Sequence, residues 1–233
     1  MLDNFEQHTF AAELECRYFL HVPQTLGTNT LLVLTLHGYG SNPRAMLHLT
    51  AGLIGLENTI AALQAPNEHY LSQGPPGPNP ATGYNWGVRD HWAAAARLHH
   101  EMALAALSIL RRRFDVPAAR CLLAGFSQAV GLNYRFVGTH PGQVGGVIGI
   151  CGGVPRDWEE DKYRTIASPI LHISREEDEY YPAATARQFP DRLRKHATDV
   201  EFHMLPGGHR FPSKAGHVVR PWLERVFGLV QKP

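Results

Sequence analysis

The sequence CLLAGFSQAVG, residues 121–131, places a serine between a short apolar run and a helical pattern. Residues 121–124 predict a buried strand, and residues 130–136 predict a helix. The chain must turn sharply between them, and small residues at Gly125 and Ala129 leave room for strand and helix to pass closely. We therefore expect Ser127 at the apex of a strand–turn–helix unit, at a helix N-terminus that favours negative charge.

This turn matches the nucleophile elbow G-x-S-x-G, except that Ala129 stands where the pattern has its last glycine. The alternative is a serine that caps a buried helix, because serine is a preferred N-cap residue. A catalytic serine also needs a base, an acid that orients the base and a second hydrogen-bond donor. The rest of the chain must supply these groups.

Apolar runs elsewhere predict further strands that are buried on both faces, as in a parallel sheet. These lie at residues 31–36, 59–63, 144–150 and 170–174, and an alternating strand follows at 200–205. Helical patterns fill residues 42–53, 93–114, 183–196 and 213–227. Partial alternation over residues 10–22 predicts one or two antiparallel edge strands that end at Pro23. The fold class is therefore α/β, with a mostly parallel central sheet, helices on both faces and an antiparallel N-terminal edge.

Length and composition suit one large domain over residues 1–233, because 233 residues with 44% hydrophobic content can bury a full core. The formal net charge of +1 argues against a nucleic-acid partner. One basic run, Arg111–Arg113, closes a helical pattern and is expected to complement that helix end. Whether the chain is a monomer or a homodimer stays open.

The location is predicted to be cytoplasmic. The N-terminus lacks a basic start followed by an apolar run, so we expect no secretory signal. No stretch approaches the roughly 18 apolar residues that span a bilayer. Cys16, Cys121 and Cys151 are an odd number and far apart, and we expect free thiols in a reducing compartment, with the two in apolar stretches buried.

Residues 67–92 lose all periodicity and contain a Pro/Gly-rich run at 74–80. A loop this long in a compact domain is usually functional or disordered. Its second half carries Tyr84, Trp86 and Trp92, so we expect it to fold over the active edge of the sheet and line a substrate pocket. The alternative is a surface loop whose aromatic side chains are tucked into the core.

Ser127, an acidic cluster at residues 176–179 and His209 follow one another along the chain, each after a predicted strand. This order of serine, acid and histidine is the one that α/β-hydrolases use. His209 follows two glycines that let its loop bend inward, and an imidazole titrates near neutrality. Asp178 is favoured as the acid by its short side chain and by Pro182 beyond it, and Glu177 is the reserve.

The loop His37-Gly38-Tyr39-Gly40 follows the buried strand at 31–36 and is expected to provide the second donor. The Tyr39 backbone N–H would act together with that of Gln128 to stabilise an oxyanion. His37 precedes the serine in the chain, so a positioning role or a packed strand-end residue is expected for it. His99-His100-Glu101 lacks a second histidine at zinc-binding spacing, so we expect a solvent-facing stripe and no metal.

Together, residues 36–40, the Gly-Phe-Ser-Gln turn, Asp178 with Pro182, and Gly-Gly-His209 resemble the phospholipase/carboxylesterase family of α/β-hydrolases, which includes acyl-protein thioesterases. The resemblance spans about residues 31–227. It implies Ser127 as nucleophile, Asp178 as acid, His209 as base and Tyr39 and Gln128 as oxyanion donors. It also implies a small-molecule ester or acyl substrate and no cofactor.

The leading hypothesis is a serine hydrolase that cleaves carboxylic esters, or thioesters, through an acyl-enzyme intermediate. One alternative is a hydrolase-fold module that binds a ligand without turnover. Another is an enzyme that resembles dienelactone hydrolases, although that family usually places cysteine at the elbow where this chain has Ser127.

Overall fold

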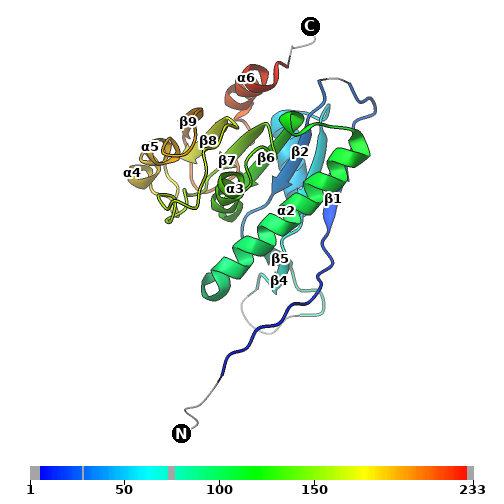
Figure 1. Ribbon diagram of the computed structural model, residues 1–233, viewed down its shortest axis with the longest axis vertical. Helices are drawn as coiled ribbons and strands as arrows, with labels where there is room; N and C mark the ends of the chain where they lie inside the picture. The colour runs from blue at the N-terminus through cyan, green and yellow to red at the C-terminus, as the bar shows by residue number, and fades with distance from the viewer. Residues whose placement is uncertain (1–5, 28, 73–76, 230–233) are drawn as a thin grey trace.

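The computed structural model describes residues 6–27, 29–72 and 77–229. Its main sheet has seven strands in the order β1-β3-β2-β6-β7-β8-β9 (Figure 1). All neighbours pair in parallel except β1, which is antiparallel to β3 at one edge. The predicted sheet is therefore confirmed. Its strands are β1 (Tyr18–His21), β2 (Leu32–Leu36), β3 (Thr59–Leu63), β6 (Cys121–Phe126), β7 (Gly146–Ile150), β8 (Ile170–Arg175) and β9 (Val200–Leu205).

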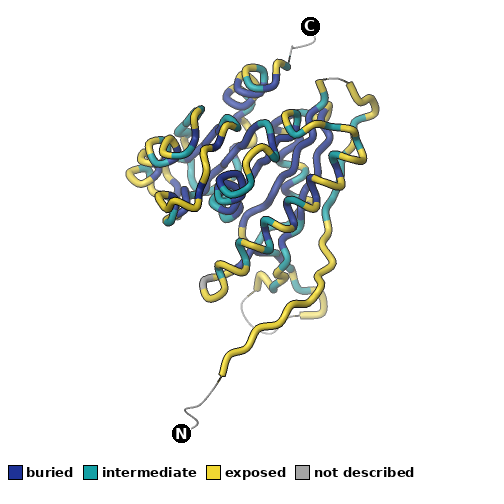
Figure 2. The backbone as a smooth tube through the Cα atoms, viewed as in Figure 1, coloured by how far each residue is buried: buried dark blue, intermediate teal, exposed yellow. Residues whose placement is uncertain are grey.

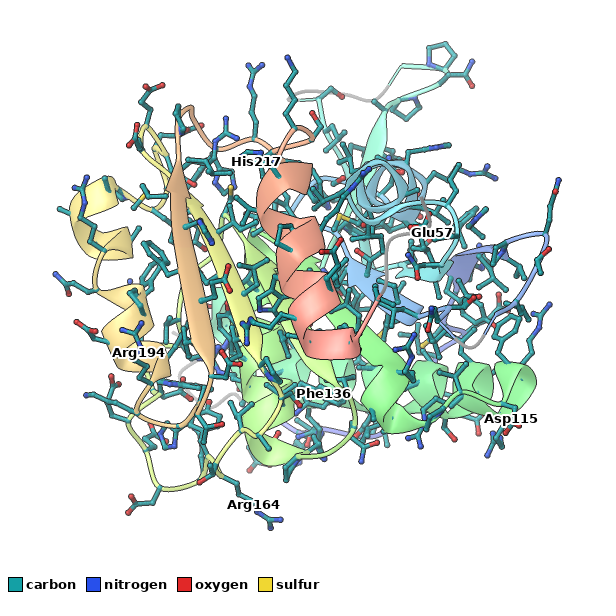
Figure 3. The ribbon with its side chains drawn as sticks, turned by 90° about the horizontal axis from the view of Figure 1, so that it is seen from above. Glu57, Asp115, Phe136, Arg164, Arg194 and His217 are labelled. Atoms are coloured by element: carbon teal, nitrogen blue, oxygen red, sulfur yellow. The ribbon has the colours of Figure 1, made fainter. Side chains whose placement is uncertain are left out.

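Helices cover both faces of the sheet, as expected. Side chains alternate between the faces along each strand, so Leu32, Leu34 and Leu36 pack in one core cluster while Leu31 and Val33 pack in the other. The first cluster lies beneath α2 (Trp92–Phe114), α3 (Gln128–Thr139), α4 (Ala183–Ala186) and α5 (Phe189–Leu193). The second lies beneath α1 (Pro43–Ile54) and α6 (Gly216–Phe227). Figure 3 shows α6, with His217 labelled at one end, lying in front of the strands of the sheet.

The N-terminal edge contains less strand than predicted. Of residues 10–22, only β1 is strand, and residues 6–17 are exposed and extend away from the sheet (Figure 2). The reason is that the neighbouring strand β3 is short. The four residues of β1 pair with Ile60–Leu63 of β3, and beyond them Gln64 N–H donates to Arg17 O (2.9 Å). Alternation without a partner strand does not make a sheet.

The helix predicted over residues 183–196 is divided into α4 and α5. Pro190 stands in the first turn of α5. Proline has no N–H to donate to the preceding turn, so a helix cannot run through it without losing a hydrogen bond. The two short helices lie beside β9 in Figure 3, where Arg194 is labelled just after α5.

Residues 67–92 are more regular than predicted. β4 (Asn67–Tyr70) and β5 (Thr82–Asn85) pair as an antiparallel hairpin, and a short 3-10 turn, η1 (Arg89–His91), leads into α2. The hairpin is tied to the loop after β2, because Gly40 N–H donates to Tyr84 O (3.0 Å) and Tyr84 N–H donates to Ser41 O (2.9 Å). The start of the Pro/Gly-rich run falls in residues 73–76, outside the described residues.

Cys121 and Cys151 are buried, Cys16 is exposed, and all three are free thiols. Arg111, Arg112 and Arg113 occupy the last turn of α2, as predicted. Over residues 6–27, 29–72 and 77–229, no helix combines the length and apolarity that a membrane crossing requires.

Candidate active site

Ser127 occupies a strained turn between β6 and α3. Its φ of 55° and ψ of −114° lie in a region that non-glycine residues rarely adopt. Two glycines make the turn sterically feasible. A Cβ at Gly125 would lie 2.5 Å from Asn133 Nδ2, and one at Gly38 would lie 3.0 Å from Ser127 Cβ. The predicted elbow is therefore closely packed at these two glycines, where an added Cβ would press against its neighbours.

Ala129 fits in the elbow despite the pattern's preference for glycine. Its side chain is fully buried. A Cβ built at Gly125 would meet the Ala129 methyl at 3.5 Å, which is ordinary van der Waals contact. The extra methyl group therefore occupies space beside Gly125 without forcing the turn open.

Three side chains form one hydrogen-bonded chain at the carboxyl edge of the sheet. Ser127 Oγ donates to His209 Nε2 (2.8 Å), and His209 Nδ1 donates to Asp178 Oδ2 (2.8 Å). The Ser127 hydroxyl does not cap α3, because its side chain makes no capping bond. An imidazole held between a hydroxyl and a carboxylate in this way can accept the hydroxyl proton while the carboxylate stabilises the imidazolium.

Asp178 is the carboxylate that faces His209. It is only 4% exposed, and its other oxygen, Oδ1, accepts the backbone N–H groups of Tyr180 and Tyr181 (both 2.9 Å). Both carboxylate oxygens are thus held by hydrogen bonds, which compensates for burying the charge. Glu177, the reserve candidate, is exposed.

The backbone amides of Tyr39 and Gln128 stay the predicted oxyanion donors, and the structure describes the surroundings of each. Gln128 is the first residue of α3, so its N–H has no intrahelical acceptor. The Gly38 carbonyl accepts from His37 Nδ1 (2.8 Å) and from Ser41 N–H (3.2 Å), which orients the peptide that it shares with Tyr39. The Tyr39 N–H points away from this carbonyl because a trans peptide holds the two groups opposed.

His37 is a packed strand-end residue. It is fully buried, and its Nε2 accepts the Ala65 N–H (3.2 Å), so its ring proton lies on Nδ1. Burial lowers the pKa of His37 to about 4. The neutral ring therefore acts as a brace for the Gly38 peptide and is separate from the chain at Ser127.

The sequence profile described as phospholipase/carboxylesterase matches residues 21–225. The chain belongs to this family. Family membership supports hydrolysis of ester bonds and identifies the protein as a hydrolase of the carboxylesterase type. No curated protein matches the sequence significantly.

Solved structures share the fold of this carboxylesterase-family chain. Esterase PE8 is 22% identical with a TM-score of 0.73, and the match covers 91% of this chain and 100% of that one. The Bacillus cereus carboxylesterase is 14% identical with a TM-score of 0.70, covering 91% and 94%. The Mesorhizobium loti carboxylesterase is 18% identical with a TM-score of 0.70, covering 92% and 97%. The predicted α/β-hydrolase fold is thus confirmed.

The three aromatic residues expected in a pocket of this family member lie in different environments. Trp86 is fully buried in the core and its Nε1 donates to His37 O (2.8 Å). Tyr84 is half-buried, with its ring edge towards the His37 ring. Trp92 begins α2 and lies 5.6 Å from the Arg135 guanidinium, beside a cavity of about 430 Å³ between α2 and α3. The structure therefore does not gather these rings around Ser127.

Aromatic side chains that the sequence reading missed surround the His209 ring instead. The ring centroids of Tyr180, Tyr181 and Phe126 lie 4.7, 5.9 and 5.3 Å from that of His209. Tyr180 is 71% exposed and stands at the rim of the site. The sequence could have indicated these residues, because Phe126 precedes Ser127 directly and the two tyrosines closely follow Asp178.

The Gln128 side chain ties the loop of residues 67–92 to the elbow. Its Oε1 accepts the Trp86 N–H (3.0 Å) and its Nε2 donates to Gly87 O (2.7 Å). One residue therefore offers its backbone N–H beside Ser127 and clamps the loop through its side chain. The sequence pattern identifies only the first of these contributions.

The polar stripe predicted for His99-His100-Glu101 is wrong at His99. This side chain is fully buried on the inner face of α2, and its Nε2 donates to Asn133 Oδ1 (3.2 Å). Burial lowers the pKa of His99 to about 3, so the ring is neutral. Among the described residues, no cluster of three or more histidine, cysteine or acidic side chains could hold a metal ion.

Proposed function

We propose that this chain is a serine hydrolase that cleaves carboxylic esters through an acyl-enzyme intermediate. The observation that carries the proposal is the hydrogen-bonded chain from Ser127 through His209 to Asp178. Ser127 Oγ attacks the acyl carbon while His209 Nε2 takes its proton and then gives it to the departing alcohol. Water activated by His209 next attacks the acyl-enzyme and releases the acid.

The Tyr39 and Gln128 amides stabilise the oxyanion that forms at each attack. Each such donor lowers the barrier by about 3 kcal/mol in a dry site. The N-terminus of α3 adds a favourable dipole at the same place. Asp178 keeps His209 in the tautomer whose Nε2 can accept a proton.

The proposed substrates are small-molecule esters, and the same steps would cleave a thioester, because a thiol is a better leaving group than an alcohol. No cofactor takes part in these steps. The buried free thiols of Cys121 and Cys151 support a reducing compartment such as the cytoplasm.

The decisive experiment compares Ser127→Ala with the wild type on p-nitrophenyl esters of graded chain length. We expect Ser127→Ala to lose at least a thousandfold in kcat and to keep its melting temperature. Ser213→Ala is the matched control, because Ser213 is exposed. Turnover that survives in Ser127→Ala would exclude this nucleophile.

A fluorophosphonate probe separates catalysis from binding without turnover. We expect the probe to label the wild type at Ser127 and to leave Ser127→Ala unlabelled, because only an activated serine attacks it. An unlabelled wild type would favour a module that binds a ligand without hydrolysing it.

A further inference from the structure

Two consecutive carboxylates hold His209 from the same loop. Asp178 Oδ2 accepts from the ring at Nδ1 (2.8 Å), and Glu179 Oε2 accepts the backbone N–H of the same histidine (3.0 Å). The first bond orients the imidazole about its side-chain torsions. The second acts on the main chain from which the imidazole projects.

The loop that carries His209 needs such an anchor. Gly207 adopts a φ of +112°, and glycine-rich segments lose more conformational freedom on ordering than others. This loop lies close to the loop of acidic residues 176–179. A Cβ at Gly208 would lie 3.4 Å from Glu179 Oε2, and Glu177 N–H donates to Gly207 O (3.0 Å). The glycines therefore let the two loops approach, and Glu179 contributes the bond to the main chain of His209 itself.

Glu179 is well suited to this bond because it is charged. The His209 N–H is the largest cause of a lowered pKa of Glu179, and Arg210 acts in the same direction. A hydrogen bond to a carboxylate is shorter and stronger than one to a neutral acceptor. The side chain is exposed, so water competes for it and its effect is expected to be moderate.

We propose that Glu179 is a positioning residue for the base, which holds the His209 main chain so that Nε2 stays within reach of Ser127 Oγ. This role rests on the proposed function and adds a residue to it. Glu179 touches no reacting atom. Its contribution is to limit the positions that the imidazole can occupy when Ser127 attacks.

The test compares three substitutions at Glu179. Glu179→Ala removes the acceptor, and we expect kcat to fall about three- to tenfold with KM unchanged. Glu179→Gln keeps an acceptor oxygen at the same reach and should restore most of the rate. Glu179→Asp is one methylene shorter and should behave like alanine, which keeps the test valid if Glu179→Ala fails to fold. Glu176→Ala removes an exposed charge from the same loop and should match the wild type.

A double-mutant cycle with His209→Ala shows whether Glu179 acts through the base. In the His209→Ala background, Glu179→Ala should cause no further loss of rate. A further loss of rate in this background would overturn the positioning role. So would full kcat in Glu179→Ala, or equal losses of kcat in Glu179→Gln and Glu179→Ala. If Ser127→Ala is inactive and Glu179→Ala is fully active, only this inference fails, whereas an active Ser127→Ala refutes the proposed function as well.

Discussion

The elbow at Ser127 and the loop at His209 meet in one hydrogen bond, but different forces hold them. The elbow is placed by close packing: a Cβ added at Gly125 or Gly38 would press against neighbouring side chains. The His209 loop is half-exposed, and His209 donates hydrogen bonds to the carboxylates of Asp178 and Glu179. The two partners of the proposed catalytic contact should therefore be sensitive to different substitutions, the elbow to added volume and the loop to lost acceptors.

The largest expected effect on kcat comes from removing the negative charge of Asp178, which accepts from His209. Asp178→Asn keeps Oδ1 for the Tyr180 and Tyr181 amides but places an NH₂ group against His209, so the ring takes the wrong tautomer. We expect kcat for an ester to fall by about 10³ to 10⁴ with little change in KM. Glu177→Gln is the control, and a comparable loss there would mean that Glu177 is the acid.

Added volume on the elbow side should cost stability as well as rate. Gly125→Ala brings a Cβ against the Asn133 amide, and the forced repacking should lower the free energy of unfolding by about 1–3 kcal/mol. Urea denaturation measures the change. Gly52→Ala is the control, because it lies in α1 with open space around it and should be neutral or stabilising by up to about 1 kcal/mol. Equal results for both variants would show that the elbow is not tightly packed.

Lowering the pH should destabilise the packing of α2 against α3 around His99 before the pH reaches the pKa of His99. The pKa of His99 is about 3 in the folded chain and near 6.5 when unfolded, so its neutral form favours folding above pH 6.5. This contribution declines as the pH falls from 6.5 towards 3, by about 1.4 kcal/mol per pH unit. His99→Gln should flatten the pH dependence of the unfolding free energy. The exposed His217→Gln should leave it unchanged, and an unaltered slope in His99→Gln would contradict the prediction.

The smallest effect is expected where the elbow departs from its usual pattern. Ala129→Gly removes one buried methyl group and adds backbone freedom to the first turn of α3. We expect the unfolding free energy to fall by about 0.5–1 kcal/mol and kcat to change less than twofold. A larger change in kcat would show that the methyl group shapes the turn.

The arrangement of the sheet was predictable because buried parallel strands are continuous apolar runs. The carboxyl ends of such strands lie along one edge, so Ser127, Asp178 and His209 could be expected near one another from chain order alone. The sequence left a reserve candidate for the acid that faces His209, since residues 176–179 are all acidic and the folded loop decides the direction that each side chain takes. The Tyr180 and Tyr181 amides that hold Asp178 belong to the folded loop.

The predictions for residues 67–92 and for His99 were wrong for different reasons. The hairpin of β4 and β5 depends on pairing across a Pro/Gly-rich run, and no local pattern shows it. Burial of His99 had a readable signal, because it is in phase with the buried residues Met102, Ala103 and Ala106 of α2. The polar character of histidine had favoured a solvent-facing position, whereas this spacing indicates a buried one.

The double attachment of Gln128 has a consequence for attempts to change the substrate range by grafting loops. A transplanted hairpin that lacks the backbone positions of Trp86 and Gly87 would release the Gln128 amide group and loosen the start of α3. Such a chimaera would lose rate on every ester alike, and the defect would be mistaken for poor substrate recognition. Loop exchanges should therefore splice before residue 86 and retain the native junction.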